Sequence, residues 1–260
     1  MDVTIYMMTD IRNSLDERID YIVEGNNESN ITIIFVHGFG VDKHETAGYF
    51  DDVAQRLGKT YKIIRFDFSG CGKSEGKMEE KDYEKWTDDL LAILKFTRDH
   101  FKGKIYIFAQ SMGTFITSLA CPDEIEKTIF TGIPNTNTDF IIKRMIDRFG
   151  TRPGAVVNLD GVSEFPRSSG AVQKIGPSFW KVLQTFDPVS TVMKYSQKTK
   201  LILIHANQDD VIGTEFLDGF GKIPHVKRIF LDGDHSWKIP EQRNILIEMV
   251  LEYFSSDTGR

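Results

Sequence analysis

Residues 108–113 read Phe-Ala-Gln-Ser-Met-Gly and close a short apolar run that begins at Ile105. A strand that ends in small-x-Ser-x-Gly and passes straight into a helix makes a sharp turn, which exposes the serine oxygen at the start of the helix. Because helix N-termini favour negative charge, an oxyanion that forms there is stabilised by the fold itself. The pattern usually has glycine where this chain has Ala109, since the turn brings the backbones of strand and helix close together. Ser111 is therefore the candidate nucleophile.

Short apolar runs alternate with longer amphipathic stretches on both sides of this turn. Six runs are near-continuous in apolar residues, as expected of strands that are covered on both faces. They are Ile31 to Val36, Tyr61 to Phe66, Lys104 to Phe108, Glu126 to Thr131, Lys200 to His205 and Val226 to Leu231. Two N-terminal segments, Val3 to Met8 and Arg18 to Val23, are predicted to form an antiparallel pair of strands.

Helical periodicity is clearest in Asp82 to Phe101, where the apolar side chains fall on one face. Asp82 is the predicted N-cap, and Gly103 lies just past the predicted end. Thr46 to Leu57 and Glu241 to Phe254 follow the same pattern more weakly. Regular alternation of strands and helices predicts an α/β fold with a mostly parallel sheet.

This alternation breaks between Pro134 and Val192, where Pro, Gly, Asn and Ser are scattered among short helical pieces. The helical pieces are Asp139 to Phe149 and Ser178 to Phe186. A long excursion between two core strands is either a functional lid or a disordered insert, and the aromatic and apolar content of this one favours a folded lid. We therefore predict a core domain of residues 1–133 and 193–260 and a lid of residues 134–192.

The composition is that of an ordinary globular protein: 260 residues, 40% hydrophobic and 27% charged, enough for one large core. The net charge of −6 argues against a nucleic-acid partner and gives no support to an anionic membrane partner. Two isolated cysteines, Cys71 and Cys121, do not have the spacing of a zinc site or a disulfide framework and suggest a reducing compartment. With no signal-peptide pattern and no apolar run long enough to span a membrane, the predicted location is the cytoplasm.

A serine hydroxyl needs a general base within hydrogen-bond reach, and the base needs an acid that orients it. His235 lies in the loop after the last predicted strand, from which an imidazole can reach across to Ser111. Asp209 follows the preceding strand, where its carboxylate can accept a hydrogen bond from the other imidazole nitrogen; Asp210 is its rival, because only one of two neighbours can point that way. Less suitable by position are the remaining histidines and the acids next to His235: His44, His100, His205, His225, Asp232 and Asp234.

Glycine-rich turns follow the first two predicted core strands. His37-Gly38-Phe39-Gly40 can direct a backbone N–H at a substrate carbonyl oxygen, so Phe39 and Met112 are the predicted backbone donors to the oxyanion. The second turn, residues 67–74, has the composition of a phosphate loop but the wrong spacing, since its first glycine would fall at Asp67. Turn formation is the better interpretation of that segment.

The chain order of oxyanion turn, serine, aspartate and histidine, each just after a strand, resembles the α/β-hydrolase superfamily. The resemblance covers nearly the whole sequence and is greatest to small capped serine esterases, including feruloyl and cinnamoyl esterases and monoacylglycerol-lipase-like enzymes. It implies an eight-stranded, mostly parallel sheet flanked by helices, with a lid after the sixth strand. It also selects Asp209 over Asp210, because the family places its acid at the first aspartate of Asp-x-Val-Ile.

The predicted function is hydrolysis of small carboxylic esters through an acyl-enzyme, with the triad Ser111, His235 and Asp209 and without a metal or organic cofactor. A thioesterase would use the same residues, and amide or carbon–carbon bond cleavage is a further alternative within the enzyme class. A non-catalytic ligand-binding protein on the same fold is the alternative outside that class, because fold does not dictate function.

Overall fold

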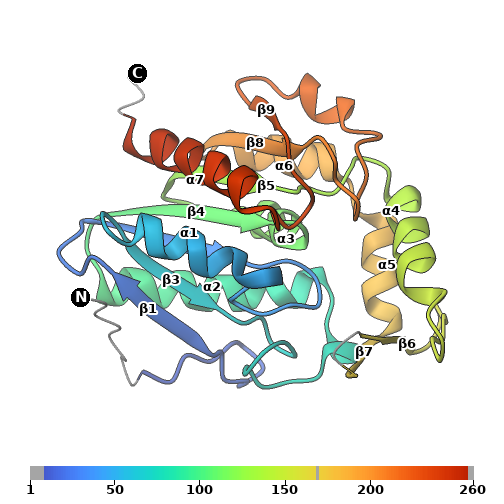
Figure 1. The fold of residues 1–260 in the computed structure, drawn as a ribbon. Helices are drawn as coiled ribbons and strands as arrows, with labels where there is room; N and C mark the ends of the chain where they lie inside the picture. The colour runs from blue at the N-terminus through green and yellow to red at the C-terminus, as the bar shows by residue number, and fades with distance from the viewer. Residues whose placement is uncertain (1–8, 168–169, 257–260) are drawn as a thin grey trace.

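The main sheet has seven strands in the computed structural model, which describes residues 9–167 and 170–256 (Figure 1). They are β1 (Tyr21–Gly25), β2 (Ile31–Val36), β3 (Lys62–Phe66), β4 (Lys104–Gln110), β5 (Ile125–Thr131), β8 (Lys200–Ala206) and β9 (Lys227–Leu231). Their order is β1-β3-β2-β4-β5-β8-β9, and every pairing is parallel except that of β1 with β3. All six predicted core strands are present, so the α/β class with a mostly parallel sheet is confirmed. The strand expected at Val3 to Met8, which would be the eighth, lies outside the described residues.

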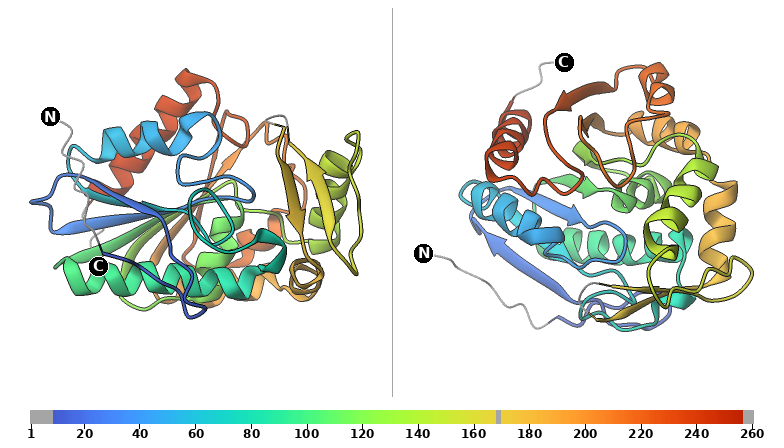
Figure 2. Two further views of the ribbon diagram at one scale, coloured as in Figure 1. Left: turned by 90° about the horizontal axis from the view of Figure 1, so that it is seen from below. Right: turned by 45° about the vertical axis from the view of Figure 1, so that its right-hand side comes forward.

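Helices cover both faces of this sheet (Figure 2). On one face lie α1 (Tyr49–Leu57) and α7 (Pro240–Ser255); on the other lie α2 (Tyr83–His100), α3 (Met112–Ala120) and α6 (Pro188–Ser196). Alternate side chains of each strand supply the two cores: Ile33 and Phe35 of β2 pack with the first pair, and Ile34 and Val36 with the second group. This two-sided burial is why the strand sequences are continuously apolar.

The helices begin and end close to their predicted limits. Asp82 caps α2 by accepting a hydrogen bond from the Lys85 backbone N–H at 3.0 Å. Gly103 follows at a φ of +106°, and a β-carbon there would lie 1.9 Å from the Asn30 carbonyl oxygen, so only glycine fits this turn. Three short 3₁₀ segments lie in the connections: η1 (Thr46–Gly48), η2 (Met78–Glu80) and η4 (Asp218–Lys222).

Residues 134–192, here called the insertion, contain most of the structure between β5 and β8. Its elements are α4 (Thr138–Met145), the π-helical turn η3 (Ile146–Gly150), β6 (Ser163–Pro166), β7 (Val172–Ile175) and α5 (Pro177–Thr185). The two predicted helical pieces correspond to α4 with η3 and to α5. The antiparallel pair β6–β7 and helix α6 did not emerge from the sequence, because four-residue strands are too short for a periodic signal. Helix α6 continues past Val192 and packs on α3 in the core.

Parallel strands end at one edge of the sheet, so the turns after β2, β3, β4, β8 and β9 lie close together there. The insertion lies beside this edge, with α4, α5 and the β6–β7 pair on the right in Figure 1. Both features place the turns named in the sequence analysis next to the insertion.

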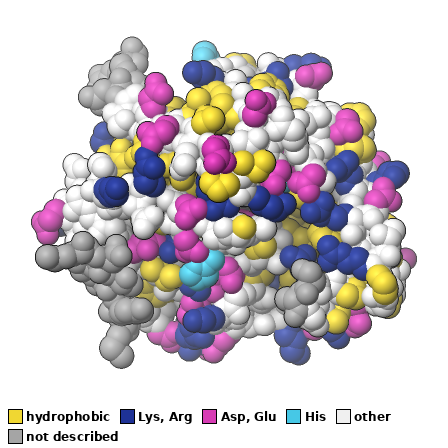
Figure 3. All heavy atoms as spheres, viewed as in Figure 1, with side chains coloured by type: hydrophobic (Ala, Val, Ile, Leu, Met, Phe, Trp, Pro, Cys, Tyr) yellow, Lys and Arg dark blue, Asp and Glu magenta, His cyan; other side chains and the backbone are white. Residues whose placement is uncertain are grey.

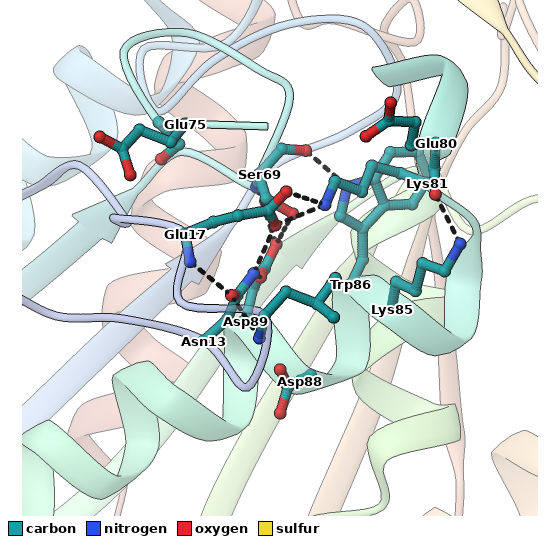
Figure 4. A network of polar contacts seen from close by, with 12 residues as sticks. Asn13, Glu17, Ser69, Glu75, Glu80, Lys81, Lys85, Trp86, Asp88 and Asp89 are labelled. Carbon is teal, nitrogen blue, oxygen red and sulfur yellow. Dashed lines mark hydrogen bonds and ion pairs between the residues drawn. The ribbon is translucent and has the colours of Figure 1, made fainter. Parts of the chain in front are cut away.

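A buried polar network joins the N-terminal segment, the turn after β3 and α2 (Figure 4). Asp89 is fully buried and accepts hydrogen bonds from Asn13 Nδ2 at 2.8 Å and from the backbone N–H and hydroxyl of Ser69, both at 2.7 Å. Beside it, Lys81 is 1% exposed and forms an ion pair with Glu17. Burial raises the pKa of Asp89 to about 6, while its three hydrogen bonds favour the charged carboxylate.

Replacing Asp89 by alanine is expected to lower the free energy of unfolding by about 2 kcal/mol, because three donors lose their acceptor in a buried place. Urea unfolding followed by circular dichroism measures the change. Asp88→Ala is the matched control on the same helix, since Asp88 is partly exposed and accepts one hydrogen bond, from the Ser14 backbone N–H at 2.6 Å. Equal losses for the two variants would contradict a special contribution from the Asp89 network.

Candidate active site

Ser111 lies between the end of β4 and the start of α3, with φ 53° and ψ −125°. A non-glycine residue in such a conformation costs on the order of 1–3 kcal/mol, and such strain is typical of functional sites. The Ser111 backbone N–H donates to the Thr131 carbonyl at 2.9 Å, which fixes the turn against β5. A β-carbon on Gly113 would lie 2.4 Å from the Val36 carbonyl oxygen, so glycine is required two residues later. This is the sharp strand–helix turn that the sequence predicts.

Ala109, the departure from the usual pattern, is fully buried in β4. It is in register with Val36 of β2 and Phe130 of β5, and its methyl group packs in the core shared with α2 and α3. The extra methyl group is therefore accommodated at the base of the turn without disturbing the pairing of the strands.

His235 and Asp209 form a buried pair after neighbouring strands β9 and β8. His235 Nδ1 lies 2.7 Å from Asp209 Oδ2, and the side chains are 7% and 3% exposed. The other carboxylate oxygen, Oδ1, accepts the backbone N–H groups of Val211 at 3.0 Å and Ile212 at 2.9 Å. Burial opposes the charged imidazole, but the Asp209 carboxylate outweighs this effect, and the pKa of His235 is raised.

The rival residues lie elsewhere. Asp210 is about half exposed and points to Arg148, with 3.5 Å between the charged groups. His205 is buried in β8 and stacks on Phe230, and its pKa is lowered to about 4, chiefly by burial. None of the other histidines lines the cavity that contains Ser111: His44, His100, His205 and His225. The structure thus pairs His235 with Asp209, the residue that the family resemblance selects.

The oxyanion turn is fixed by His37 and Glu45. Fully buried His37 donates from Nδ1 to the Gly38 carbonyl oxygen at 2.8 Å and accepts the Phe68 backbone N–H at Nε2, at 2.9 Å, so it joins the turns after β2 and β3. Glu45, which the sequence analysis missed, accepts the Gly38 backbone N–H at 2.5 Å. A β-carbon on Gly38 would lie 3.1 Å from Ser111 Cβ, so this turn passes directly over the serine.

The two predicted oxyanion donors, Phe39 and Met112, line the same cavity as Ser111 and His235. Met112 is the first residue of α3, and the first N–H groups of a helix have no acceptor within the helix. The cavity has a volume of about 290 Å³.

The turn after β3 is occupied by a side chain of the protein itself. The buried Asp67 carboxylate accepts hydrogen bonds from Lys43 Nζ at 2.7 Å and from the Lys73 backbone N–H at 2.8 Å, so the turn has no room for a phosphate. Burial raises the pKa of the Cys71 thiol in that turn to about 12.

Gln110, one residue before the candidate nucleophile, is a second residue that sequence reasoning missed. Its side-chain amide donates to the His235 carbonyl oxygen at 2.8 Å, and its carbonyl oxygen accepts the hydroxyl of Thr131. A polar residue at the end of an otherwise apolar strand is the sequence signal that could have identified Gln110. Its position ties the His235 loop directly to β4.

Gln110→Ala is expected to reduce kcat about tenfold, since it removes one hydrogen bond that holds the His235 loop, worth about 1 kcal/mol, and leaves a buried carbonyl unpaired. Steady-state hydrolysis of p-nitrophenyl acetate measures the change. The conservative Gln110→Glu variant keeps the shape but loses the donor, so it should be at least as slow. An unchanged kcat in both variants would show that this contact does not position His235.

Comparison with known proteins supports the fold described above. A family model of hydrolases, described as serine aminopeptidase, S33, matches residues 27–138, which include the oxyanion turn and the serine turn. The esterase Est1E from Butyrivibrio proteoclasticus, solved with ferulic acid bound, superposes with a TM-score of 0.75 over 94% of this chain and 96% of its own, at 22% identity. The chain has the α/β-hydrolase fold.

Two further solved structures support the same fold. The Pyrococcus furiosus esterase Pf2001 has a TM-score of 0.71 at 21% identity, over 100% of this chain and 91% of its own. Mouse alpha/beta hydrolase domain-containing protein 10 has a TM-score of 0.63 at 18% identity, over 98% of each chain. The fold that the motif resemblance implies is therefore confirmed.

Curated relatives in sequence are palmitoyl-protein thioesterases named ABHD10, mitochondrial. The bovine protein is 32% identical over 97 residues, which are 36% of this chain and 30% of its own length. The human protein is 25% identical over 189 residues, which are 69% of this chain and 57% of its own length. The matches thus cover about a third to little more than half of these relatives. Their names place them in mitochondria, whereas a cytoplasmic location of this chain remains a prediction.

In the parts of the chain that the structure describes, none of the helices has both the length and the apolar character needed to cross a membrane. The same residues contain no cluster of three or more His, Cys, Asp or Glu side chains arranged to hold a metal ion.

Proposed function

We propose that this chain is a serine hydrolase that cleaves carboxylic esters through an acyl-enzyme. The observation that carries the proposal is the buried His235–Asp209 pair, 2.7 Å apart, on the cavity that also contains Ser111 on its strained turn. A nucleophile, a base and an acid that orients the base are the elements that acyl transfer requires. The esterase neighbours and the hydrolase family model support the same reaction class.

The mechanism follows from the hydrogen bonds of His235. With Nδ1–H donated to Asp209, Nε2 carries the lone pair and accepts the Ser111 proton as the serine oxygen attacks the acyl carbon. The backbone N–H groups of Phe39 and Met112 stabilise the negative charge that develops on the carbonyl oxygen. His235 then gives its proton to the leaving oxygen, and a water molecule repeats the sequence to release the acid and restore Ser111.

We further propose that the insertion, residues 134–192, acts as a lid on the core formed by residues 1–133 and 193–260. It supplies five apolar side chains to the cavity: Pro134, Ile141, Met145, Phe149 and Phe179. These side chains would contact the acyl or alcohol group of the substrate. A volume of about 290 Å³ lies at the lower end of the range of ligand pockets, roughly 300–1,000 Å³, and favours small esters.

Thioester cleavage is the second candidate, because the curated relatives are thioesterases and the same three residues would perform it. A non-catalytic binding protein is less consistent with the site, since ligand binding alone does not require a serine on a strained turn next to a buried His–Asp pair.

The test is hydrolysis of p-nitrophenyl esters of graded acyl length beside thioesters with the same acyl groups, combined with labelling by a fluorophosphonate probe. A serine hydrolase should cleave at least one series and take up one label at Ser111. Absence of both turnover and label would refute the proposal and favour a binding protein. The ratio of ester to thioester turnover decides between the two enzymatic candidates.

A further inference from the structure

The cavity that contains the candidate nucleophile is lined by four cationic side chains. They are Arg148, Arg152, Arg167 and Lys238. Glu45 is the one acidic side chain among the described lining residues, and burial raises its pKa to about 7, which leaves it partly neutral near that pH. Figure 3 shows Lys and Arg side chains gathered around hydrophobic side chains on the right of the molecule, toward the insertion. A positive cavity is unexpected in a chain whose net charge is −6.

Arg152 and Arg167 both lie close to one aromatic ring of the insertion, that of Phe149. Their guanidinium carbons are 5.0 Å and 5.6 Å from the ring centroid of Phe149. Arg167 donates to Gln173 Oε1 at 2.8 Å and to the Gly40 carbonyl oxygen at 3.0 Å, so it reaches the oxyanion turn. Arg152 donates to the Pro166 carbonyl oxygen at 2.8 Å.

Neither of these two arginines forms an ion pair with a carboxylate of residues 9–167 or 170–256, whereas Arg148 lies 3.5 Å from Asp210. A guanidinium has five N–H donors in a planar fork. Within the described part of the chain, two donors of Arg167 and one of Arg152 have hydrogen-bond acceptors. Among the residues that the structure describes, the remaining donors have no hydrogen-bond acceptor and neither charge has an anionic partner.

The positive charges of the arginines also repel one another. Burial lowers the pKa of Arg167, and the nearby charges of Arg152 and Arg148 lower it further. Because arginine stays protonated in proteins, this repulsion is a cost that an anion between the side chains would relieve. A planar fork matches the two oxygens of a carboxylate or phosphate.

We propose that Arg152 and Arg167 bind an anionic group, a carboxylate or a phosphate, carried by the substrate of this cavity. The inference rests on the proposed function for its use in catalysis, and it narrows the substrates to esters or thioesters with a negative charge on the acyl part or on the leaving group. Phe149 and its apolar neighbours would contact the part of the substrate that links its negative charge to the reacting carbonyl group.

Two matched pairs of substrates test the proposal. The first pair is the p-nitrophenyl monoester of hexanedioic acid against p-nitrophenyl hexanoate, which places the carboxylate on the acyl part. The second is butanoyl-coenzyme A against butanoyl-N-acetylcysteamine, which places phosphates on the leaving group. For at least one pair, we expect the kcat/KM of the parent to be about tenfold higher for the anionic member than for the neutral one. Arg152→Gln and Arg167→Gln should each bring this ratio close to one.

Arg98→Gln is the control, because it removes the same charge from the far end of α2 and should leave the ratio unchanged. Preference for the neutral member of both pairs, or a ratio that Arg98→Gln lowers as much as Arg167→Gln, would overturn the anion site. Arg152→Gln serves independently if Arg167→Gln does not fold.

A binding measurement separates this proposal from the proposed function. Hexanedioate and coenzyme A are titrated by calorimetry into Ser111→Ala and into Ser111→Ala combined with Arg167→Gln. Binding of either anion to the first protein, weakened about tenfold in the second, supports the anion site even if the parent cleaves no ester. Hydrolysis of neutral esters without binding of either anion would refute the anion site and leave the proposed function intact.

Discussion

Ser111→Ala is expected to lower kcat for p-nitrophenyl acetate by on the order of a millionfold, as loss of the nucleophile does in serine hydrolases of known mechanism. The size of the effect follows from the mechanism, since without the serine oxygen no acyl-enzyme forms and His235 has no proton to accept. The remaining rate would come from the oxyanion donors acting on water. Alanine shares the steric limits of serine at φ 53°, so the turn and the fold should be retained.

Ser118→Ala is the matched control, because Ser118 is a buried serine on α3, the helix that follows Ser111, and its hydroxyl donates to the Phe115 carbonyl oxygen at 3.0 Å. It should retain the activity of the parent. Stopped-flow and steady-state assays on both variants, with thermal unfolding as a check of folding, decide the matter. A Ser111→Ala protein that hydrolyses the ester as fast as the parent would remove Ser111 from the mechanism.

Most of the fold could be predicted from the sequence because the sheet is buried on both faces. Burial on two sides makes each strand a continuous apolar run, as in Ile31–Val36, and such runs are distinguishable from the amphipathic helices between them. The pair β6–β7 was not predictable because each strand has only four residues and each face of the pair mixes polar and apolar side chains. Its position depends on contacts with η2 and with the oxyanion turn, which sequence periodicity does not encode.

The candidate site likewise contains residues that the sequence predicts and residues that it does not. The placement of Ser111, His235 and the Asp209–Asp210 segment at one edge was predictable because each follows a strand, and parallel strands bring their carboxyl ends to one edge. The choice of Asp209 over Asp210 came from the family resemblance. Gln110, Glu45 and Arg167 were not predictable, because their contacts depend on side-chain directions and on loops from distant parts of the chain. The missed residues position or surround the predicted ones. The sequence therefore does not predict how the catalytic groups are held in place or which substrates the site selects.

Asp209→Asn is expected to reduce kcat by about four orders of magnitude, the loss seen when the triad acid is made neutral elsewhere. The asparagine oxygen can still accept the Val211 and Ile212 N–H groups, which turns the amide nitrogen toward His235. That nitrogen donates to Nδ1, so the imidazole proton moves to Nε2, and the base can no longer accept the proton of Ser111. The protein keeps its shape and loses the required tautomer.

The pH dependence of activity and a control substitution at Asp210 test whether the effect belongs to Asp209. In the parent, Asp209 raises the pKa of His235, so activity should fall with decreasing pH through a midpoint above 6.5, where the imidazole becomes protonated. In Asp209→Asn the residual activity should persist to lower pH, because burial remains and the attracting charge is gone. Asp210→Asn should keep the rate of the parent within about threefold, since its carboxylate faces Arg148. It should also shift the midpoint less than Asp209→Asn does, because Asp210 raises the pKa of His235 less than Asp209. If instead Asp210→Asn produced the large loss and Asp209→Asn did not, the assignment of the acid would be reversed.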